Sequence, residues 1–152
     1  MRVIGLLGGM SWESSIVYEQ IINEEVRRRL GGVHSADLII RSYDFADIER
    51  LQSSGDWEQA GALLADGART LQAAGAKLLV LCTNTMHTVA EVIAAAVDVP
   101  LIHIADPTAA AIKAAGLTTW CAISGGACWP GGLAGVGYRS AARSETRPAT
   151  AM

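Results

Sequence analysis

The segment Lys77-Leu-Leu-Val-Leu-Cys82, which runs into the polar turn Thr83-Asn-Thr85, is the most apolar strand candidate in the chain. A short apolar run bounded by a polar turn is typical of a strand that is buried on both faces of a parallel sheet. We expect a helix over residues 87–97 to follow the turn. The segment therefore predicts one strand–helix unit of an α/β protein.

Strand–helix units of the same kind precede and follow this segment. The expected strands lie at residues 2–7, 38–43, 77–82 and 101–104. The expected helices run from Ser11 or Ser14 to Leu30 and over residues 44–52, 56–74, 87–97 and 106–116. Asp44, Asp56 and Asp106 stand where three of these helices begin, and aspartate is a preferred N-cap. The alternation predicts an α/β fold, a parallel sheet of about four strands with helices on both faces and a site at the carboxyl ends of the strands.

The chain changes character after Thr119. Residues 1–119 contain nine Lys/Arg and fourteen Asp/Glu, whereas residues 120–152 contain three and one and are rich in glycine and alanine. A strand candidate at residues 120–124 is followed by Pro130-Gly-Gly132, which is typical of a loop. We therefore expect an α/β domain over residues 1–119 and a poorly ordered, irregular tail over residues 120–152.

The composition of the 152 residues excludes several classes of protein. The net charge is −3 at pH 7, and the one basic run, Arg27–Arg29, is too short for a nucleic-acid surface. No apolar run approaches the roughly 20 residues that span a bilayer, so we expect no membrane role. The three cysteines form no CxxC pair and no secretory leader precedes Met1, which predicts a protein of the reducing cytoplasm.

Cys82 is the main candidate for chemistry. A thiol at the end of a central strand, just before a helix begins, lies where backbone amides favour the thiolate. The alternative is that Cys82 is a small buried apolar residue, which is the commoner role of a lone cysteine. The neighbours Thr83, Asn84 and Thr85 favour the first interpretation, because donor groups beside a thiolate suit a ligand that bears a carboxylate.

The other candidate residues are less specific. The pair Gly8-Gly9 lacks the third glycine of the dinucleotide fingerprint, and a close approach of the backbone to a small ligand is the better interpretation. Two roles are open for His87, which either tunes the Cys82 thiol or caps its helix. His34 and His103 are expected to be structural, and no histidine or cysteine pair has metal-ligand spacing, so we expect no metal.

Five motifs in this order resemble the aspartate/glutamate racemase superfamily, and more narrowly its broad-specificity amino-acid racemase branch. They are Gly5-Leu-Leu-Gly-Gly-Met-Ser-Trp-Glu-Ser14, Arg29-Leu-Gly-Gly-Val-His-Ser35, Gly55-Asp-Trp57, Leu81-Cys-Thr-Asn-Thr-Met-His87 and His103-Ile-Ala-Asp106. The resemblance covers about residues 1–119, and Cys-Thr-Asn-Thr carries most of its weight. It implies one domain of the two-domain fold of this superfamily.

The resemblance implies racemisation of a small amino acid without a cofactor. In such enzymes one cysteine removes the α-proton and a second cysteine returns a proton on the opposite face, because a single base would return its proton with retention. Cys82 matches the first of these cysteines. The turn after it matches the loop that holds the α-carboxylate, and the glycine-rich loop after the first strand matches the border of the pocket. We expect the following residues to contact the substrate: Gly9, Met10, Ser11, Thr83, Asn84 and Thr85.

The sequence departs from the superfamily pattern in its last part. Members of the superfamily carry the second cysteine in a Gly-Cys-Thr-Glu stretch of a second domain, and no Cys-Thr-Glu occurs here. Cys121 and Cys128 are therefore not assigned as the second base. Two explanations are open: residues from about 120 onward are an out-of-frame tail on a truncated gene, or the protein is naturally short.

Two functions are consistent with this departure. The first is a racemase that lacks the second cysteine domain, and the alternative is an inactive remnant that binds small amino acids or only self-associates. Apolar surface left without a covering helix predicts a homo-oligomer in both cases. Arg41 and Arg50 are the nearby cations for an acidic substrate, and Arg50 is the weaker candidate because it falls on a solvated helix face.

Overall fold

The computed structural model describes the backbone of residues 1–116, 119–124 and 127–132. The chain divides into two compact units, Met1–Thr108 and Ala109–Met152. The elements follow one another as β1 (Ile4–Gly8), α1 (Trp12–Leu30), β2 (Leu38–Ser42), α2 (Phe45–Ser54), α3 (Trp57–Ala73), β3 (Leu78–Leu81), the 3₁₀ helix η1 (Thr85–Val89), α4 (Ala90–Ala95), β4 (Leu101–Ile102), α5 (Ala105–Ala114), β5 (Thr119–Ser124) and β6 (Ala127–Gly132).

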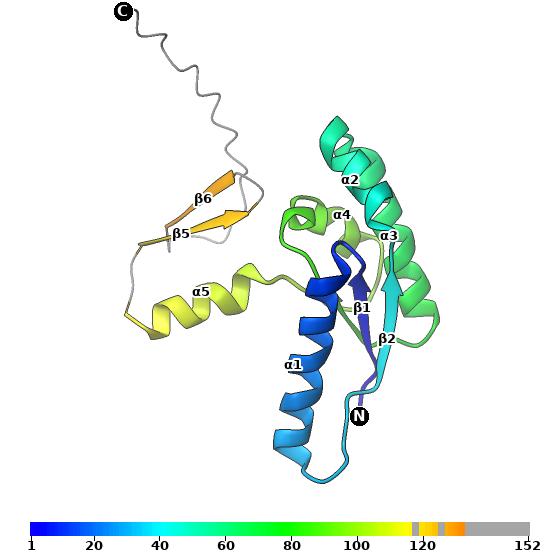
Figure 1. The fold of residues 1–152 in the computed structure, drawn as a ribbon, viewed down its shortest axis with the longest axis vertical. Coiled ribbons are helices and arrows are strands. Elements are labelled where there is room, and N and C mark those ends of the chain that lie inside the picture. Colours follow the sequence, from blue (N-terminus) through cyan, green and yellow to red (C-terminus); the bar gives the residue numbers. More distant parts are fainter. Residues whose placement is uncertain (117–118, 125–126, 133–152) are drawn as a thin grey trace, which may run out of the picture. The chain divides into compact units, whose positions relative to one another are not determined.

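The first unit is built on a four-stranded parallel sheet with the strand order β2-β1-β3-β4 (Figure 1). In the register of the sheet, Leu6 of β1 stands opposite Ile40 of β2 and Val80 of β3. The predicted α/β fold with a parallel sheet of four strands is confirmed. Because all strands run the same way, the loops that follow β1, β2 and β3 meet at one edge of the sheet.

The hydrophobic core lies on one face of the sheet, beneath α2, α3, η1 and α4. Leu7, Leu79 and Leu81 point into this core from the strands, and they alternate with side chains of the opposite face. Helix α3 contributes Leu64 and Leu71 at helical spacing, both buried. This face therefore has the close packing of an ordinary doubly wound sheet.

The other face of the sheet is much less covered. Within Met1–Thr108, α1 is the one long helix that lies on it (Figure 1), and none of its residues is buried. Ile40 on β2 and Ile102 on β4 are each 42% exposed, and they flank the strip of sheet on which α1 lies. Two apolar side chains of α1, those of Ile16 and Ile21, are about half exposed at 49% and 59%.

The ends of the helices follow the capping signals in the sequence. The carboxylate of Asp44 accepts a hydrogen bond from the Ala46 backbone N–H at 3.0 Å, and that of Asp56 accepts one from the Gln59 N–H at 3.0 Å. Both aspartates are thus confirmed as N-caps. Helix α1 ends at Gly31, whose φ of 76° is the positive value that glycine adopts without strain.

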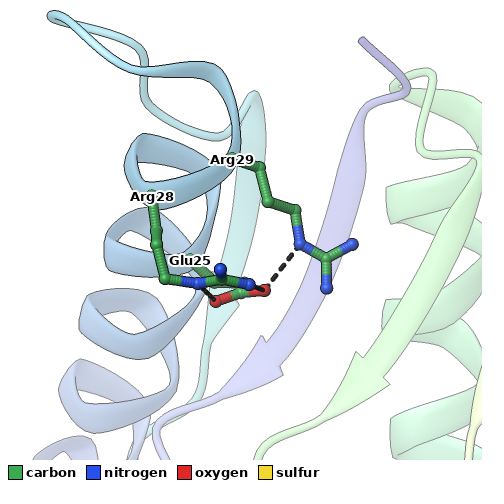
Figure 2. Close-up of polar contacts among 3 residues, drawn as sticks. All are labelled: Glu25, Arg28 and Arg29. Atoms are coloured by element: carbon green, nitrogen blue, oxygen red, sulfur yellow. Dashed lines mark hydrogen bonds and ion pairs between the residues drawn. The ribbon is translucent and has the colours of Figure 1, made fainter.

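The last turns of α1 carry an exposed ion-pair cluster of Glu25, Arg28 and Arg29 (Figure 2). Arg28 and Arg29 donate to the Glu25 carboxylate at 2.6 to 2.8 Å, and these hydrogen bonds lower the pKa of Glu25 to about 2. The arginines also lie at the carboxyl end of the helix, where positive charge is favourable. This cluster lies on a solvated face of the helix, and its contribution to stability is screened by salt.

Three local expectations are corrected. The helix expected over 87–97 is a 3₁₀ turn, η1, followed by the six-residue α4. Helix α5 begins at Ala105, so Asp106 lies in its first turn and is not its N-cap. Pro130 to Gly132 belong to β6, which pairs antiparallel with β5, and not to a loop. Both strands of a two-stranded sheet are edge strands. An edge strand tolerates a proline, because the backbone groups on its outer side need no hydrogen-bond partner within the sheet.

The remaining residues of the expected tail lie outside the described part of the chain, so the domain division at residue 119 stays a prediction. Across the residues that the structure does describe, every helix is too short or too polar to cross a bilayer.

Candidate active site

The loops after β1, β2 and β3 are joined by hydrogen bonds at the carboxyl edge of the sheet. The Cys82 backbone N–H donates to the Leu7 carbonyl at 2.9 Å, and the Tyr43 N–H donates to the Gly8 carbonyl at 3.1 Å. Ser14 at the start of α1 donates its hydroxyl to the Cys82 carbonyl at 3.3 Å. The convergence of these three loops, expected from the strand order, is therefore present in the structure.

Cys82 has no exposed area, and it directly follows β3. Its Sγ lies 3.9 Å from the Val80 carbonyl oxygen. Burial raises the pKa of the thiol to about 12, because the thiolate would lose its hydration. We expected backbone amides to favour the thiolate, whereas burial acts in the opposite direction. The following helix is a 3₁₀ turn that begins only at Thr85, so desolvation is the dominant effect.

Tyr18 is a neighbour of Cys82 that sequence reasoning missed. Burial raises the pKa of its phenol, and a charge on Cys82 raises this pKa further, which places the phenol close to the thiol. Tyr18 and Ser14 are separated by one turn of α1, so both face the end of β3. The four-residue spacing was visible in the sequence, but which side of α1 meets the sheet was not.

The turn after Cys82 presents its three polar residues differently. Thr83 is buried, Asn84 is exposed and Thr85 is partly buried. The Asn84 carbonyl accepts the His87 N–H at 3.1 Å and thereby starts η1. Asn84 is thus the member of the predicted carboxylate loop that a ligand from solvent meets first.

The loop after β1 is fixed from inside the protein. Gly9 has φ of 81°, and its N–H donates to the Ser15 hydroxyl at 2.9 Å. A Cβ at Gly9 would overlap the backbone nitrogen and oxygen of Tyr43. Met10 is buried in the core, and Ser11 donates its hydroxyl to Glu13 at 2.6 Å. Only glycine therefore fits at position 9. The substrate contacts expected of Gly9, Met10 and Ser11 stay predictions.

His87 is 2% exposed, and its Nε2 accepts a hydrogen bond from the Ile104 backbone N–H at 3.3 Å. Its ring packs edge-on against His103 with the centroids 4.5 Å apart. Burial, and after it the nearby His103, lower the pKa of His87 to about 4, so the ring is neutral at pH 7. The position that caps η1 is occupied by Asn84, so the capping role considered for His87 is not observed.

The two candidate cations differ in their surroundings. The guanidinium of Arg41 lies 4.7 Å from the centre of the Tyr43 ring and donates to the Ser42 carbonyl, next to the end of β2. Arg50 pairs with Asp47 at 3.6 Å on an exposed helix surface, as expected from its helical position. In the part of the chain that the structure describes, no three His, Cys, Asp or Glu side chains gather in a way that suits a metal ion.

Comparison with known proteins agrees with this arrangement. The family model described as Asp/Glu/Hydantoin racemase matches residues 7–124, which include the loops after β1, β2 and β3. The chain belongs to the Asp/Glu/Hydantoin racemase family. The match includes Cys82 and the turn that follows it.

Two solved structures show the same fold. One is a Yersinia pestis protein assigned as an Asp/Glu racemase, with 53% identity and a TM-score of 0.75 over 78% of this chain and 51% of that one. The other is an aspartate racemase homologue from Pyrococcus horikoshii OT3, with 32% identity and a TM-score of 0.65 over 76% of this chain and 50% of that one. This racemase-family chain therefore spans about half the length of the two solved proteins.

Proposed function

We propose that the chain catalyses proton transfer at the α-carbon of a small amino acid, with Cys82 as the acid/base group and without a cofactor. The observation that supports this most is the position of Cys82 and its Thr-Asn-Thr turn at the carboxyl edge of the sheet, in a chain of the racemase family. The Thr83–Thr85 turn binds the α-carboxylate, and donors there stabilise the negative charge that develops on the carbanion. Gly9, Met10 and Ser11 form the facing border.

Because the Cys82 thiol is buried, the substrate has to lower its pKa before the thiol can act as a base. Because burial raises the pKa of Cys82 to about 12, the thiol is protonated at pH 7. A substrate ammonium group beside the sulfur lowers this pKa, because an opposite charge nearby favours the charged form. The thiolate then removes the α-proton, so that the C–H bond breaks and an S–H bond forms. Exclusion of water from the site favours this step.

Inversion needs a second acid on the opposite face of the α-carbon. Among the described side chains Cys82 is the one free cysteine. We propose that the complete site is assembled by self-association, with the second acid supplied by another copy. Half-exposed apolar side chains on α1 and at the sheet edges support such an assembly: Trp12, Ile16, Val17, Ile21, Ile40 and Ile102.

Sedimentation velocity over a hundredfold range of concentration tests the assembly. We expect a dimer or larger oligomer whose mass falls on dilution, and Ile21→Glu should shift the equilibrium toward the monomer. The matched change Val33→Glu, at a fully exposed position between α1 and β2, should leave it unaltered. A chain that stays monomeric at every concentration contradicts the assembly.

A second candidate function is binding of amino acids without turnover. It is favoured by one observation, the complete burial of the Cys82 thiol, which keeps it protonated and away from solvent.

We propose the cytoplasm as the location for either function, because free thiols persist in a reducing compartment.

Chiral chromatography after incubation with L-alanine, L-aspartate and L-glutamate separates the two functions. Catalysis predicts the D-enantiomer of at least one substrate, a loss of at least about a hundredfold in Cys82→Ser and unchanged rates in the control Cys121→Ser. Amino-acid binding measured by calorimetry without formation of any D-enantiomer would instead establish the binding function.

A further inference from the structure

His87 connects two segments that are distant in the sequence but meet at the carboxyl edge of the sheet. It lies in η1, directly after the predicted carboxylate turn, and its own N–H donates to the Asn84 carbonyl. Its Nε2 accepts the backbone N–H of Ile104, between β4 and α5. The ring therefore links the chain after β3 to the chain after β4.

The hydrogen bond to Ile104 determines which nitrogen of His87 carries the proton. An N–H that donates to Nε2 requires a lone pair on Nε2, so the proton of the neutral ring is on Nδ1. The surroundings keep the ring neutral, since burial and the adjacent His103 both lower its pKa. The pKa of His103 is itself lowered by burial, while Asp106 acts in the opposite direction.

The Nδ1–H group is the second polar group of the His87 ring. Nδ1 is buried and has no hydrogen-bond partner in the described part of the chain. The backbone groups of Thr83 and Asn84 raise the pKa of His87, but burial and His103 lower it more. A buried donor without a partner is unfavourable, so the hydrogen bond at Nε2 is the polar contact that fixes the ring.

We propose that His87 is a positioning residue that holds the Thr83–Asn84 backbone in place for the substrate carboxylate, with its neutral ring anchored on the Ile104 N–H. His87 reaches the turn through its backbone N–H, which donates to the Asn84 carbonyl, and its ring is anchored on the Ile104 N–H, so we expect its effect to be on substrate binding. This inference rests on the proposed function, and two measurements distinguish the failure of one from the failure of the other.

Three variants isolate the anchoring hydrogen bond. His87→Gln keeps an oxygen that accepts the Ile104 N–H, whereas His87→Leu has a similar volume and no acceptor. His34→Leu is the matched control, because His34 is exposed in the loop before β2. His87→Asn, whose side chain is too short to reach Ile104, replaces His87→Leu if that variant does not fold.

The first measurement needs no substrate. Amide hydrogen exchange at Ile104, followed by NMR, should be at least about tenfold faster in His87→Leu than in the wild type, in His87→Gln or in the His34→Leu control. Imidazole ¹⁵N spectra should show His87 with its proton on Nδ1 from pH 8 to pH 5. Unchanged exchange at Ile104 in His87→Leu, or a proton on Nε2, would overturn the anchor.

The second measurement reports on the positioning role. For the amino acid that the wild type turns over, His87→Leu should raise KM about tenfold with kcat changed less than twofold, and His87→Gln should restore most of the loss. Equal KM values in His87→Leu and the wild type, or a fall in kcat alone, would overturn positioning of the carboxylate turn. A wild type that neither turns over nor binds any amino acid overturns the proposed function and with it the substrate part of this inference. If the amide exchange rate at Ile104 still depends on His87 in that case, the anchor is nevertheless established.

Discussion

The thiol of Cys82 is covered on the α1 side of the sheet by a helix whose Ser14 and Tyr18 face the end of β3. This cover explains why the pKa of the Cys82 thiol is raised, although the local sequence favours a thiolate. Helix-terminal amides act over a short distance, whereas desolvation depends on elements that lie far away along the chain. The identity of the candidate acid/base group could therefore be predicted from the sequence, but its protonation state could not.

The raised pKa of Cys82 predicts a specific dependence of stability on pH. The thiol is near pKa 8.5 in the unfolded chain and about 12 in the folded chain, so the folded state retains a proton that the unfolded state loses. This contribution to stability is fully present below pH 8.5 and is lost as the pH rises toward 12. Between pH 7.5 and 9.5 the wild type should lose about 1 kcal/mol more unfolding free energy than Cys82→Ala. Urea denaturation at the two pH values measures this difference, and parallel losses in both proteins would show that the thiol is not desolvated in solution.

Gly9 illustrates a residue whose role depends on its surroundings more than on its own conformation. Gly9→Ala should destabilise the chain by at least about 2 kcal/mol, because the added Cβ requires a strained φ and also overlaps the Tyr43 backbone. Gly31→Ala is the matched control, since Gly31 has a similar φ of 76° but a Cβ added there would meet no heavy atom within 4 Å. Thermal denaturation should show a clearly larger loss for Gly9→Ala, and equal losses would mean that the loop can move away from Tyr43.

The helices α1 and α3 both carry apolar side chains at helical spacing, but their burial is very different. The periodicity predicts that each helix exists, Asp44 and Asp56 predict where α2 and α3 begin, and Gly31 predicts where α1 ends. Burial could not be predicted in this way, because Ile16 and Ile21 look the same in the sequence whether or not a second layer covers them. The sequence pattern also could not predict that η1 is a 3₁₀ helix, because residues 85–89 are compatible with either type of helix.

Matched truncations in these two helices test the difference. Leu64→Ala in α3 removes a fully buried side chain and should cost about 2 to 5 kcal/mol of unfolding free energy. Ile16→Ala in α1 should change it by no more than about 0.5 kcal/mol, because the side chain is half exposed and alanine favours the helix. Chemical denaturation at a concentration where the chain is monomeric gives both values. A cost above about 2 kcal/mol for Ile16→Ala would contradict the openness of the sheet face on which α1 lies.

At the scale of the whole molecule, family membership and fold are clear. The sheet brings the loops after β1, β2 and β3 together, as the strand order predicts, and Cys82 directly follows β3 at this edge. The central claim is therefore that Cys82 transfers the α-proton of an amino acid, and it holds whether or not inversion follows.

The most direct test is solvent deuterium incorporation at the α-carbon of L-alanine, L-aspartate and L-glutamate, followed by NMR and mass spectrometry in D₂O. We predict incorporation into at least one of them by the wild type and by Cys121→Ser, with a loss of at least about a hundredfold in Cys82→Ser. Incorporation with retention would identify Cys82 as a single working base, and incorporation with inversion would add a second acid. Exchange that is equally fast in Cys82→Ser, or no exchange with any amino acid in the wild type, would contradict the account.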